Sequence, residues 1–168
     1  ETLCLLGSNI GIGYLDQIAH LTRLCNDIGL DTIEAGVTIG VLCDAGVMDF
    51  GDYERAVELL NEIPKGSPLG TLVGSGSVVC AKAYGVERIP ATKGQGMAAY
   101  DPRVIKGQGV TYATTPMGAD HTAGNAIVAQ GDHKDPTGKV QISVDLQVFT
   151  AVQDILGLCI FTTRPINE

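Results

Sequence analysis

The segment DYERAVELLNEIP, residues 52–64, is the clearest amphipathic stretch of the chain and points to a helical fold. Asp52 stands where a helix cap is needed, because its side chain can accept a hydrogen bond from a free backbone N–H of the first turn. Apolar residues then recur at helical spacing, and Pro64 lies where the helix can no longer continue. This apolar stripe consists of Tyr53, Ala56, Leu59, Leu60 and Ile63. The segment therefore predicts an amphipathic helix that packs against a core.

Two more helices are predicted upstream of this segment. Apolar residues recur at helical spacing from Leu15 to Ile28, and Gly29 is placed to end that helix in a left-handed turn. Asp31 is the expected cap of the next helix, whose apolar run extends over residues 33–41. Asp31 and Glu34 also have the spacing of a capping box, although the usual first residue of that motif is Ser or Thr.

Downstream, the pattern predicts short helices separated by a long loop. Ser67-Pro68 is typical of a cap followed by proline at the first helical position, and residues 78–84 predict a short helix closed by Gly85. Residues 89–109 are rich in glycine and contain two prolines, so we expect an ordered loop with little regular structure. Strands are poorly supported, because the β-branched residues mostly lie within helical periods.

The last part of the chain predicts an exposed turn and a long helix. Residues 131–138 are polar and typical of a turn, and residues 140–156 are apolar on two helical faces, which favours a central helix. The predicted fold class is therefore all-α and multihelical, with irregular orthogonal packing and a long Gly/Pro-rich ordered loop. We expect a helical segment at residues 1–88 and a loop with helices at residues 89–168, packed as one compact unit.

The amino-acid composition indicates which classes of binding partner and which cellular compartment to expect. The chain has 168 residues, 45% of them hydrophobic and 18% charged, which favours a globular protein. Its net charge of −8 disfavours binding to nucleic acid and to anionic membranes. There is no signal peptide and no run of about 18 apolar residues, so a cytoplasmic location is expected.

Five cysteines without a CxxC pair indicate neither a disulfide framework nor a zinc site, and we expect Cys4, Cys25, Cys43 and Cys80 to be buried thiols. Because the sequence begins at Glu1 rather than at Met, we interpret it as a fragment or a processed product.

Two short segments share one pattern, NDIGLD at residues 26–31 and DILGLC at residues 154–159. A helix that ends in glycine turns sharply, so flanking short side chains and freed backbone groups can converge on a ligand at the helix terminus. Carboxylates there would accept hydrogen bonds from the ring N–H and NH2 groups of a pterin. In the alternative interpretation both segments are ordinary helix ends, with Asp31 a cap and Cys159 a small buried hydrophobe.

The pair resembles the two pterin-binding motifs, Asp-x-x-Gly-Leu-Cys/Asp, of the tungsten-dependent aldehyde ferredoxin oxidoreductases. The second segment matches in full, whereas the first has Asn26 where the pattern has Asp. Residues 93–103, 109–114 and 118–121 also resemble stretches of that family, and the resemblance covers nearly the whole chain. It implies the middle helical domain of such an enzyme and the start of its third domain.

The resemblance implies a tungsten (or molybdenum) bis-pterin cofactor with a nearby [4Fe–4S] cluster, aldehyde oxidation to a carboxylic acid, and electron transfer to ferredoxin. Cys159 is implied as a cluster ligand, which suits the chemistry because thiolates hold iron–sulfur clusters. The family supplies the other three cysteines from an upstream group that this chain lacks. The implied cofactor-binding residues are Asn26, Gly29, Leu30, Asp31, Asp154, Gly157 and Leu158.

Since that cysteine group is missing, we expect the isolated chain to be inactive and free of both cofactors. The implied partners are the missing N-terminal and C-terminal parts of the same enzyme, ferredoxin and an aldehyde, with a homodimer as a further possibility.

By the same resemblance, Glu1 aligns with a glutamate beside the metal and His121 with a histidine that could hydrogen-bond the substrate oxygen. Both residue types suit proton transfer near neutral pH. Without the resemblance, Glu1 would be a solvated terminal residue and His121 a structural hydrogen-bonding residue. Two other functions stay open at this point: a stand-alone helical interaction or scaffold domain, and a related tungsten enzyme acting on an aromatic thioester.

Overall fold

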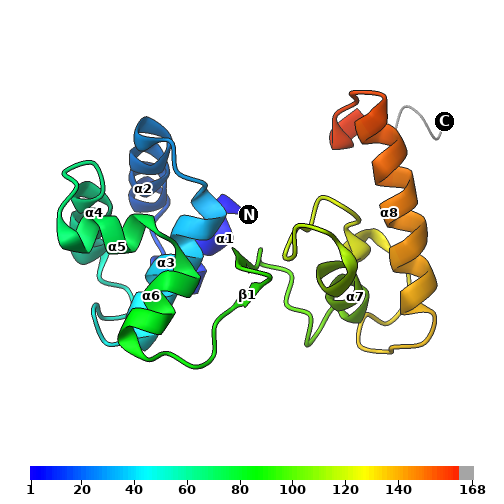
Figure 1. Ribbon diagram of the computed structural model, residues 1–168, viewed down its shortest axis with the longest axis horizontal. Coiled ribbons are helices and arrows are strands. Elements are labelled where there is room, and N and C mark those ends of the chain that lie inside the picture. The colour runs from blue at the N-terminus through cyan, green and yellow to red at the C-terminus, as the bar shows by residue number, and fades with distance from the viewer. Residues whose placement is uncertain (163–168) are drawn as a thin grey trace. The chain divides into compact units, whose positions relative to one another are not determined.

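The computed structural model describes residues 1–162 and consists mainly of helices (Figure 1). The predicted all-α, multihelical fold class is confirmed. The helices are α1 (Thr2–Leu5), η1 (Ser8–Ile10), α2 (Leu15–Ile28), α3 (Thr32–Asp44), α4 (Tyr53–Glu62), α5 (Pro68–Gly74), α6 (Ser77–Tyr84), α7 (Lys106–Thr114), η2 (Ala126–Val128), α8 (Lys139–Ile155) and η3 (Ile160–Thr162). Strands β1 (Ala91–Thr92) and β2 (Gln95–Gly96) form a small antiparallel hairpin.

The chain divides into two compact units, Glu1–Ala99 and Tyr100–Glu168, which are called unit 1 and unit 2 below. From the sequence, a division is predicted after residue 88, with both segments packed as one compact unit. This prediction refers to the domains of a larger enzyme, and it stays a prediction. Within residues 1–162, no helix is long and apolar enough to cross a membrane.

Helix α3 forms the centre of unit 1. It packs against α1, α2, α5 and α6, and its residues from Ala35 to Leu42 are buried except for Gly40. A helix that is apolar on all sides needs neighbours on all sides, which explains this position. Gly36 allows α1 to approach closely, because a Cβ atom there would lie 2.6 Å from the Leu5 carbonyl oxygen.

The caps predicted in unit 1 are confirmed. Asp52 Oδ1 accepts a hydrogen bond from the Arg55 N–H at 3.0 Å, at the start of α4. Ser67 Oγ accepts one from the Gly70 N–H at 2.9 Å, at the start of α5. In α4 the apolar stripe faces the core: Ala56, Leu59 and Leu60 are buried.

The ordered loop with little regular structure that was predicted over residues 89–109 contains two regular elements that the sequence did not indicate. Lys93 and Gly94, with φ of 53° and 90°, form a two-residue turn between β1 and β2, as expected for a tight hairpin. Helix α7 already begins at Lys106. Its glycines disfavour a helix, but a Cβ atom at Gly107 would lie 2.8 Å from the Ala126 Cβ atom, so close packing accounts for this residue.

In unit 2, helix α8 packs on α7 with its polar side, contrary to the predicted central apolar helix. Ser143, Thr150 and Gln153 are buried, whereas the main apolar stripe is exposed. We call that stripe the valine face; it consists of Val140, Val144, Val148, Val152 and Ile155. The periodicity was sufficient to predict the helix, but it could not tell which side of the helix meets the rest of the unit.

Candidate functional site

The first Gly-Leu segment forms the turn that ends α2. Gly29 has a left-handed backbone with φ of 74°, and its N–H donates to the Asn26 carbonyl at 3.2 Å. The Leu30 N–H donates to the Cys25 carbonyl at 2.8 Å. These two hydrogen bonds define a Schellman motif. The predicted helix end at Gly29 is therefore confirmed.

The second segment forms the same motif at the end of α8. Gly157 has φ of 68°, its N–H donates to the Asp154 carbonyl at 3.0 Å, and the Leu158 N–H donates to the Gln153 carbonyl at 2.9 Å. Asp154 thus holds the position in this turn that Asn26 holds in the first. The two segments, which are similar in sequence, therefore also share the same backbone geometry.

That geometry occurs elsewhere in unit 1. The Val47 N–H donates to the Leu42 carbonyl at 2.9 Å after Gly46, and the Val86 N–H donates to the Ala81 carbonyl at 2.9 Å after Gly85. The backbone turn is thus a common way to end a helix. Any ligand specificity has to come from the side chains beside the turn.

The polar side chains of the two segments are exposed: Asn26, Asp31, Asp154 and Cys159. The alternative prediction that Cys159 is a buried hydrophobe is wrong. Asp31 has the predicted capping role, since its carboxylate accepts hydrogen bonds from the Ile33 and Glu34 N–H groups at 3.1 and 3.3 Å. A carboxylate with two oxygens can cap a helix and still accept further hydrogen bonds.

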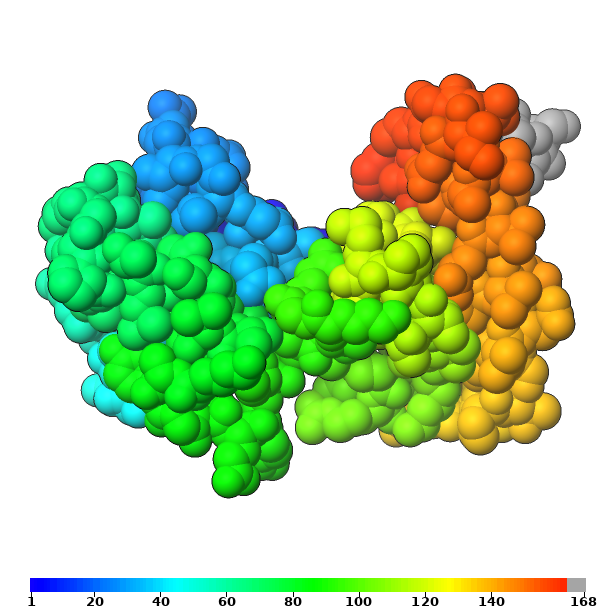
Figure 2. Space-filling model, in the orientation of Figure 1, coloured from blue at the N-terminus to red at the C-terminus, as the bar shows by residue number. Residues whose placement is uncertain are grey.

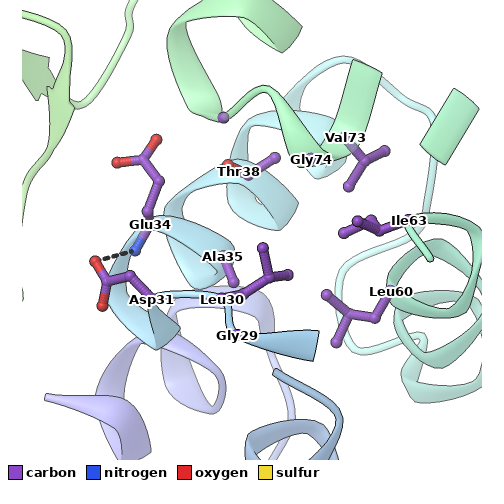
Figure 3. A pocket seen from close by; sticks show the side chains of 11 residues that line it. Gly29, Leu30, Asp31, Glu34, Ala35, Thr38, Leu60, Ile63, Val73 and Gly74 are labelled. Carbon is purple, nitrogen blue, oxygen red and sulfur yellow. Dashed lines mark hydrogen bonds between the residues drawn. The ribbon is translucent and has the colours of Figure 1, made fainter. Parts of the chain in front are cut away.

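A small pocket of about 140 Å³ borders the first segment (Figure 3). Leu30, Leu60, Ile63 and Val73 point toward one another across it, whereas the carboxylates of Asp31 and Glu34 point away from this apolar group. Pockets for cofactor-sized ligands usually have about 300–1,000 Å³. The pocket is thus too small for such a ligand; Leu30 packs against the core beside it, and Asp31 and Glu34 are among the residues that line it.

Glu1 lies in unit 1, directly before a residue that contacts the start of α3. Its Oε2 atom accepts a hydrogen bond from the Ala99 N–H at 3.0 Å, and its side chain is half-buried. The neighbouring Thr2 hydroxyl lies 2.8 Å from the Thr32 hydroxyl, which follows Asp31 directly. The start of α1 and the start of α3 are therefore joined, and Glu1 is not a frayed, fully solvated residue.

Glu34 is a structural residue whose contacts the sequence did not predict. The capping-box spacing suggests that its side chain reaches back to Asp31, but its Oε1 atom accepts hydrogen bonds from the Ser77 N–H at 2.8 Å and the Ser77 hydroxyl at 2.6 Å. Its Oε2 atom accepts a third from the Gly96 N–H at 2.7 Å. One carboxylate thus joins α3, α6 and the hairpin, and it positions the loop that leads to Ala99.

His121 lies in unit 2, half-buried in a loop held by local hydrogen bonds. Its ring centroid is 5.4 Å from that of Tyr100, with an angle of 40° between the rings. The following turn is fixed by Asp120 Oδ1, which accepts hydrogen bonds from the Thr122 N–H at 2.8 Å and the Thr122 hydroxyl at 2.6 Å. The imidazole therefore has an aromatic neighbour and a defined backbone.

The loop before α7 carries an exposed ion pair. Arg103 donates hydrogen bonds to the Asp101 carboxylate and thereby lowers the pKa of that group. The Arg103 side chain is 86% exposed, as expected for a surface turn.

The sequence-predicted site residues fall into two groups. Glu1 and residues 26–31 belong to unit 1, and His121 and residues 154–159 belong to unit 2. Their convergence on one cofactor stays a prediction. Within the described residues 1–162, no three side chains of His, Cys, Asp or Glu come close enough to hold a metal ion.

Comparison with known proteins identifies the family. Residues 1–168 match the family described as aldehyde ferredoxin oxidoreductase, domains 2 and 3. The chain belongs to this family, so the resemblance seen in the two Gly-Leu segments is confirmed.

Among its relatives are the tungsten-containing aldehyde ferredoxin oxidoreductases of Pyrococcus furiosus and Thermococcus kodakarensis, each 30% identical over 97% of this chain. An aliphatic sulfonate oxidoreductase, WOR-like subunit, of Pyrococcus furiosus is 26% identical over 98% of this chain. These alignments cover 31%, 31% and 28% of the relatives, so the chain spans about a third of their length.

Proposed function

We propose that this chain is the part of a tungsten-pterin, iron–sulfur oxidoreductase that encloses the cofactor, in an enzyme that oxidises aldehydes to carboxylic acids with ferredoxin as electron acceptor. The supporting observation is that both Gly-Leu segments adopt one turn and present polar side chains outward, in a chain that matches the family from end to end. Molybdenum in place of tungsten is compatible with the same residues.

The side chains fit the chemistry of a pterin. In one segment Asn26, Gly29, Leu30 and Asp31 would hold one pterin, and in the other Asp154, Gly157 and Leu158 would hold the second. Their exposed carboxylates can accept hydrogen bonds from pterin ring N–H and NH2 groups. The glycines, with φ of 74° and 68°, leave the backbone uncovered, since a Cβ atom at either would have no neighbour within 4 Å.

The exposed Cys159 thiol fits a ligand of a [4Fe–4S] cluster. The other three thiolates would come from other parts of the polypeptide, because a cubane needs four. The same reasoning predicts that the isolated 168 residues neither retain a cluster nor turn over aldehydes.

Oxidation of an aldehyde with water yields the acid, two protons and two electrons. The bound tungsten-pterin group would supply the two-electron acceptor. Glu1 would take a proton from water or from the aldehyde hydrate, with its carboxylate oriented by the Ala99 N–H. His121 would hydrogen-bond the substrate oxygen, with its ring supported by Tyr100. Aldehydes are the favoured substrate class, because the relatives at 30% identity are named for them and the sulfonate enzyme is 26% identical.

Substitutions that keep the helix caps test the pterin assignment. Asparagine caps helices about as well as aspartate, so Asp31→Asn removes the charge but keeps the cap of α3. Asp52→Asn makes the same change at the cap of α4, away from both segments. In the full-length polypeptide we expect Asp31→Asn and Asp154→Ala to lower the pterin and tungsten content, with Asp52→Asn unchanged. Alanine is used at residue 154 because Asn26, at the equivalent position of the first segment, is itself proposed to hold a pterin. Metal analysis and pterin fluorescence after release measure this content.

Cys159→Ser should lower the iron content and the aldehyde-dependent reduction of ferredoxin. Unchanged tungsten in both aspartate variants would remove the basis of the proposal. Equal losses in Asp52→Asn would point to a stability effect instead.

A further inference from the structure

The valine face of α8 is an unusual surface for a helix in contact with water. Its five side chains are 45% to 83% exposed. Figure 2 shows atoms of α8, in orange, on the surface along the length of the helix. Only three of the seventeen residues of α8, namely Lys139, Asp145 and Asp154, carry a charge. Contiguous exposed apolar patches mark interaction surfaces, so we interpret the valine face as a surface that another segment covers.

The polar side of α8 fixes this orientation. The Ser143 hydroxyl is fully buried and lies 2.7 Å from the Thr111 hydroxyl of α7. Gln147 Nε2 donates a hydrogen bond to Thr114 Oγ1 at 2.9 Å. Turning α8 to bury the valines against α7 would separate the buried Ser143 and Thr111 hydroxyls, and a buried polar group without a partner typically costs about 1–3 kcal/mol. The valine face is therefore directed away from α7 by specific hydrogen bonds.

We infer that the valine face is covered by an apolar segment of the same polypeptide that lies outside residues 1–168. The relatives extend well beyond the aligned part, since the chain covers 31% of their length. A covalently linked segment is present at a high effective concentration, which favours it over a separate molecule. The inference rests on the longer polypeptide of the proposed function and is independent of its cofactors.

Two lysine substitutions on α8 test the inference. Val148→Lys places a charge in the valine face, and the matched Gln141→Lys places the same charge at an exposed polar position, where Asp145 is its neighbour. Lysine is at least as good a helix former as either residue. We expect Val148→Lys to lower the Tm of the full-length polypeptide by several degrees and Gln141→Lys to leave it unchanged. In the 168-residue chain neither variant should lower the Tm.

The other outcomes overturn the inference. An unchanged Tm for Val148→Lys in the full-length polypeptide would mean that nothing covers the face. An equal loss in the 168-residue chain would mean that these residues themselves cover it. If Val148→Lys instead converts a dimer of the full-length polypeptide into a monomer in size-exclusion chromatography, the occupant is a second copy. The readouts are thermal stability and size, so failure here would leave the cofactor proposal intact.

Discussion

At the residue scale, Glu34 is the most connected side chain near the first Gly-Leu segment. Its carboxylate accepts three hydrogen bonds from two segments that are 43 and 62 residues away in sequence. Sequence reasoning correctly placed it in the first turn of α3 but gave it a local partner. Nothing in the local pattern could indicate Ser77 or Gly96, because such partners are set by the packing of α6 and the hairpin against α3.

Glu34→Gln should destabilise unit 1. The amide retains one acceptor oxygen and places an NH2 donor against an N–H donor, and the loss of such a buried partner typically costs about 1–3 kcal/mol. Urea unfolding of the 168-residue chain measures the change in free energy of unfolding. Glu58→Gln is the matched control, since Glu58 is 65% exposed and pairs only with Arg55 among the described residues, and such pairs contribute about 0–1 kcal/mol. Similar effects of the two substitutions would contradict the structural role of Glu34.

The buried thiol of Cys25 should make the free energy of unfolding decrease at alkaline pH. Burial, and secondarily the charge of Asp31, raise the pKa of this thiol from 9.0 to about 11. Between these values the unfolded chain releases the proton and the folded chain retains it, so the contribution of Cys25 is complete below pH 9 and is lost as the pH rises toward about 11. We expect Cys25→Ala to have a shallower decline in this window, measured by urea unfolding at several pH values. Parallel declines in both proteins would refute the assignment. The expectation of buried thiols holds for Cys25 and Cys80 but is wrong for Cys4, which is exposed, and only half right for Cys43, which is half-buried.

At the scale of single elements, the helix ends were the most predictable feature. The stop at Gly29 and the caps at Asp31, Asp52 and Ser67 follow from a few neighbouring residues, because the hydrogen bonds of a cap span only three or four positions. The start of α7 was missed because Gly107 is explained by close packing on Ala126, which is distant in sequence.

Gly29→Ala tests the Schellman turn without a packing effect. A Cβ atom at Gly29 has no neighbour within 4 Å, so the cost arises from the left-handed backbone alone, about 1–2 kcal/mol. Gly13 has the same open surroundings but no positive φ, and Gly13→Ala should change the free energy of unfolding by less than about 0.5 kcal/mol or stabilise slightly. Chemical denaturation of both variants measures the difference. Equal values would show that the turn at Gly29 tolerates a side chain.

At the scale of the whole molecule, the two units have very different cores. The hydrophobic cluster of buried side chains lies in residues 6–81, within unit 1. In the described part of unit 2, the buried hydrophobic residues are Ile105, Tyr112, Ala119 and Ala126, and much of the remaining interior is polar. Apolar burial is the dominant stabilising contribution in folding, so unit 1 should be the more stable of the two.

Separate expression of the units checks this difference. We expect residues 1–99 to fold alone with a cooperative thermal transition in circular dichroism, since domains of this size can bury enough surface. Residues 100–168 should show weak helicity and a broad transition, because the valine face lacks a cover and the α7–α8 contact is polar. A sharp transition for residues 100–168 and none for residues 1–99 would contradict this reading of the cores.

The sequence by itself determined the helical class, most helix ends and the family, because these depend on short-range periodicity, caps and two six-residue motifs. The tertiary structure decided that Glu34 joins three segments, that Glu1 lies beside the start of α3, and that α8 turns its valines outward. These features depend on contacts between residues far apart in the chain, and local periodicity is the same for either side of a helix. In α8 the buried side is the one whose Ser143 hydroxyl meets the Thr111 hydroxyl of α7.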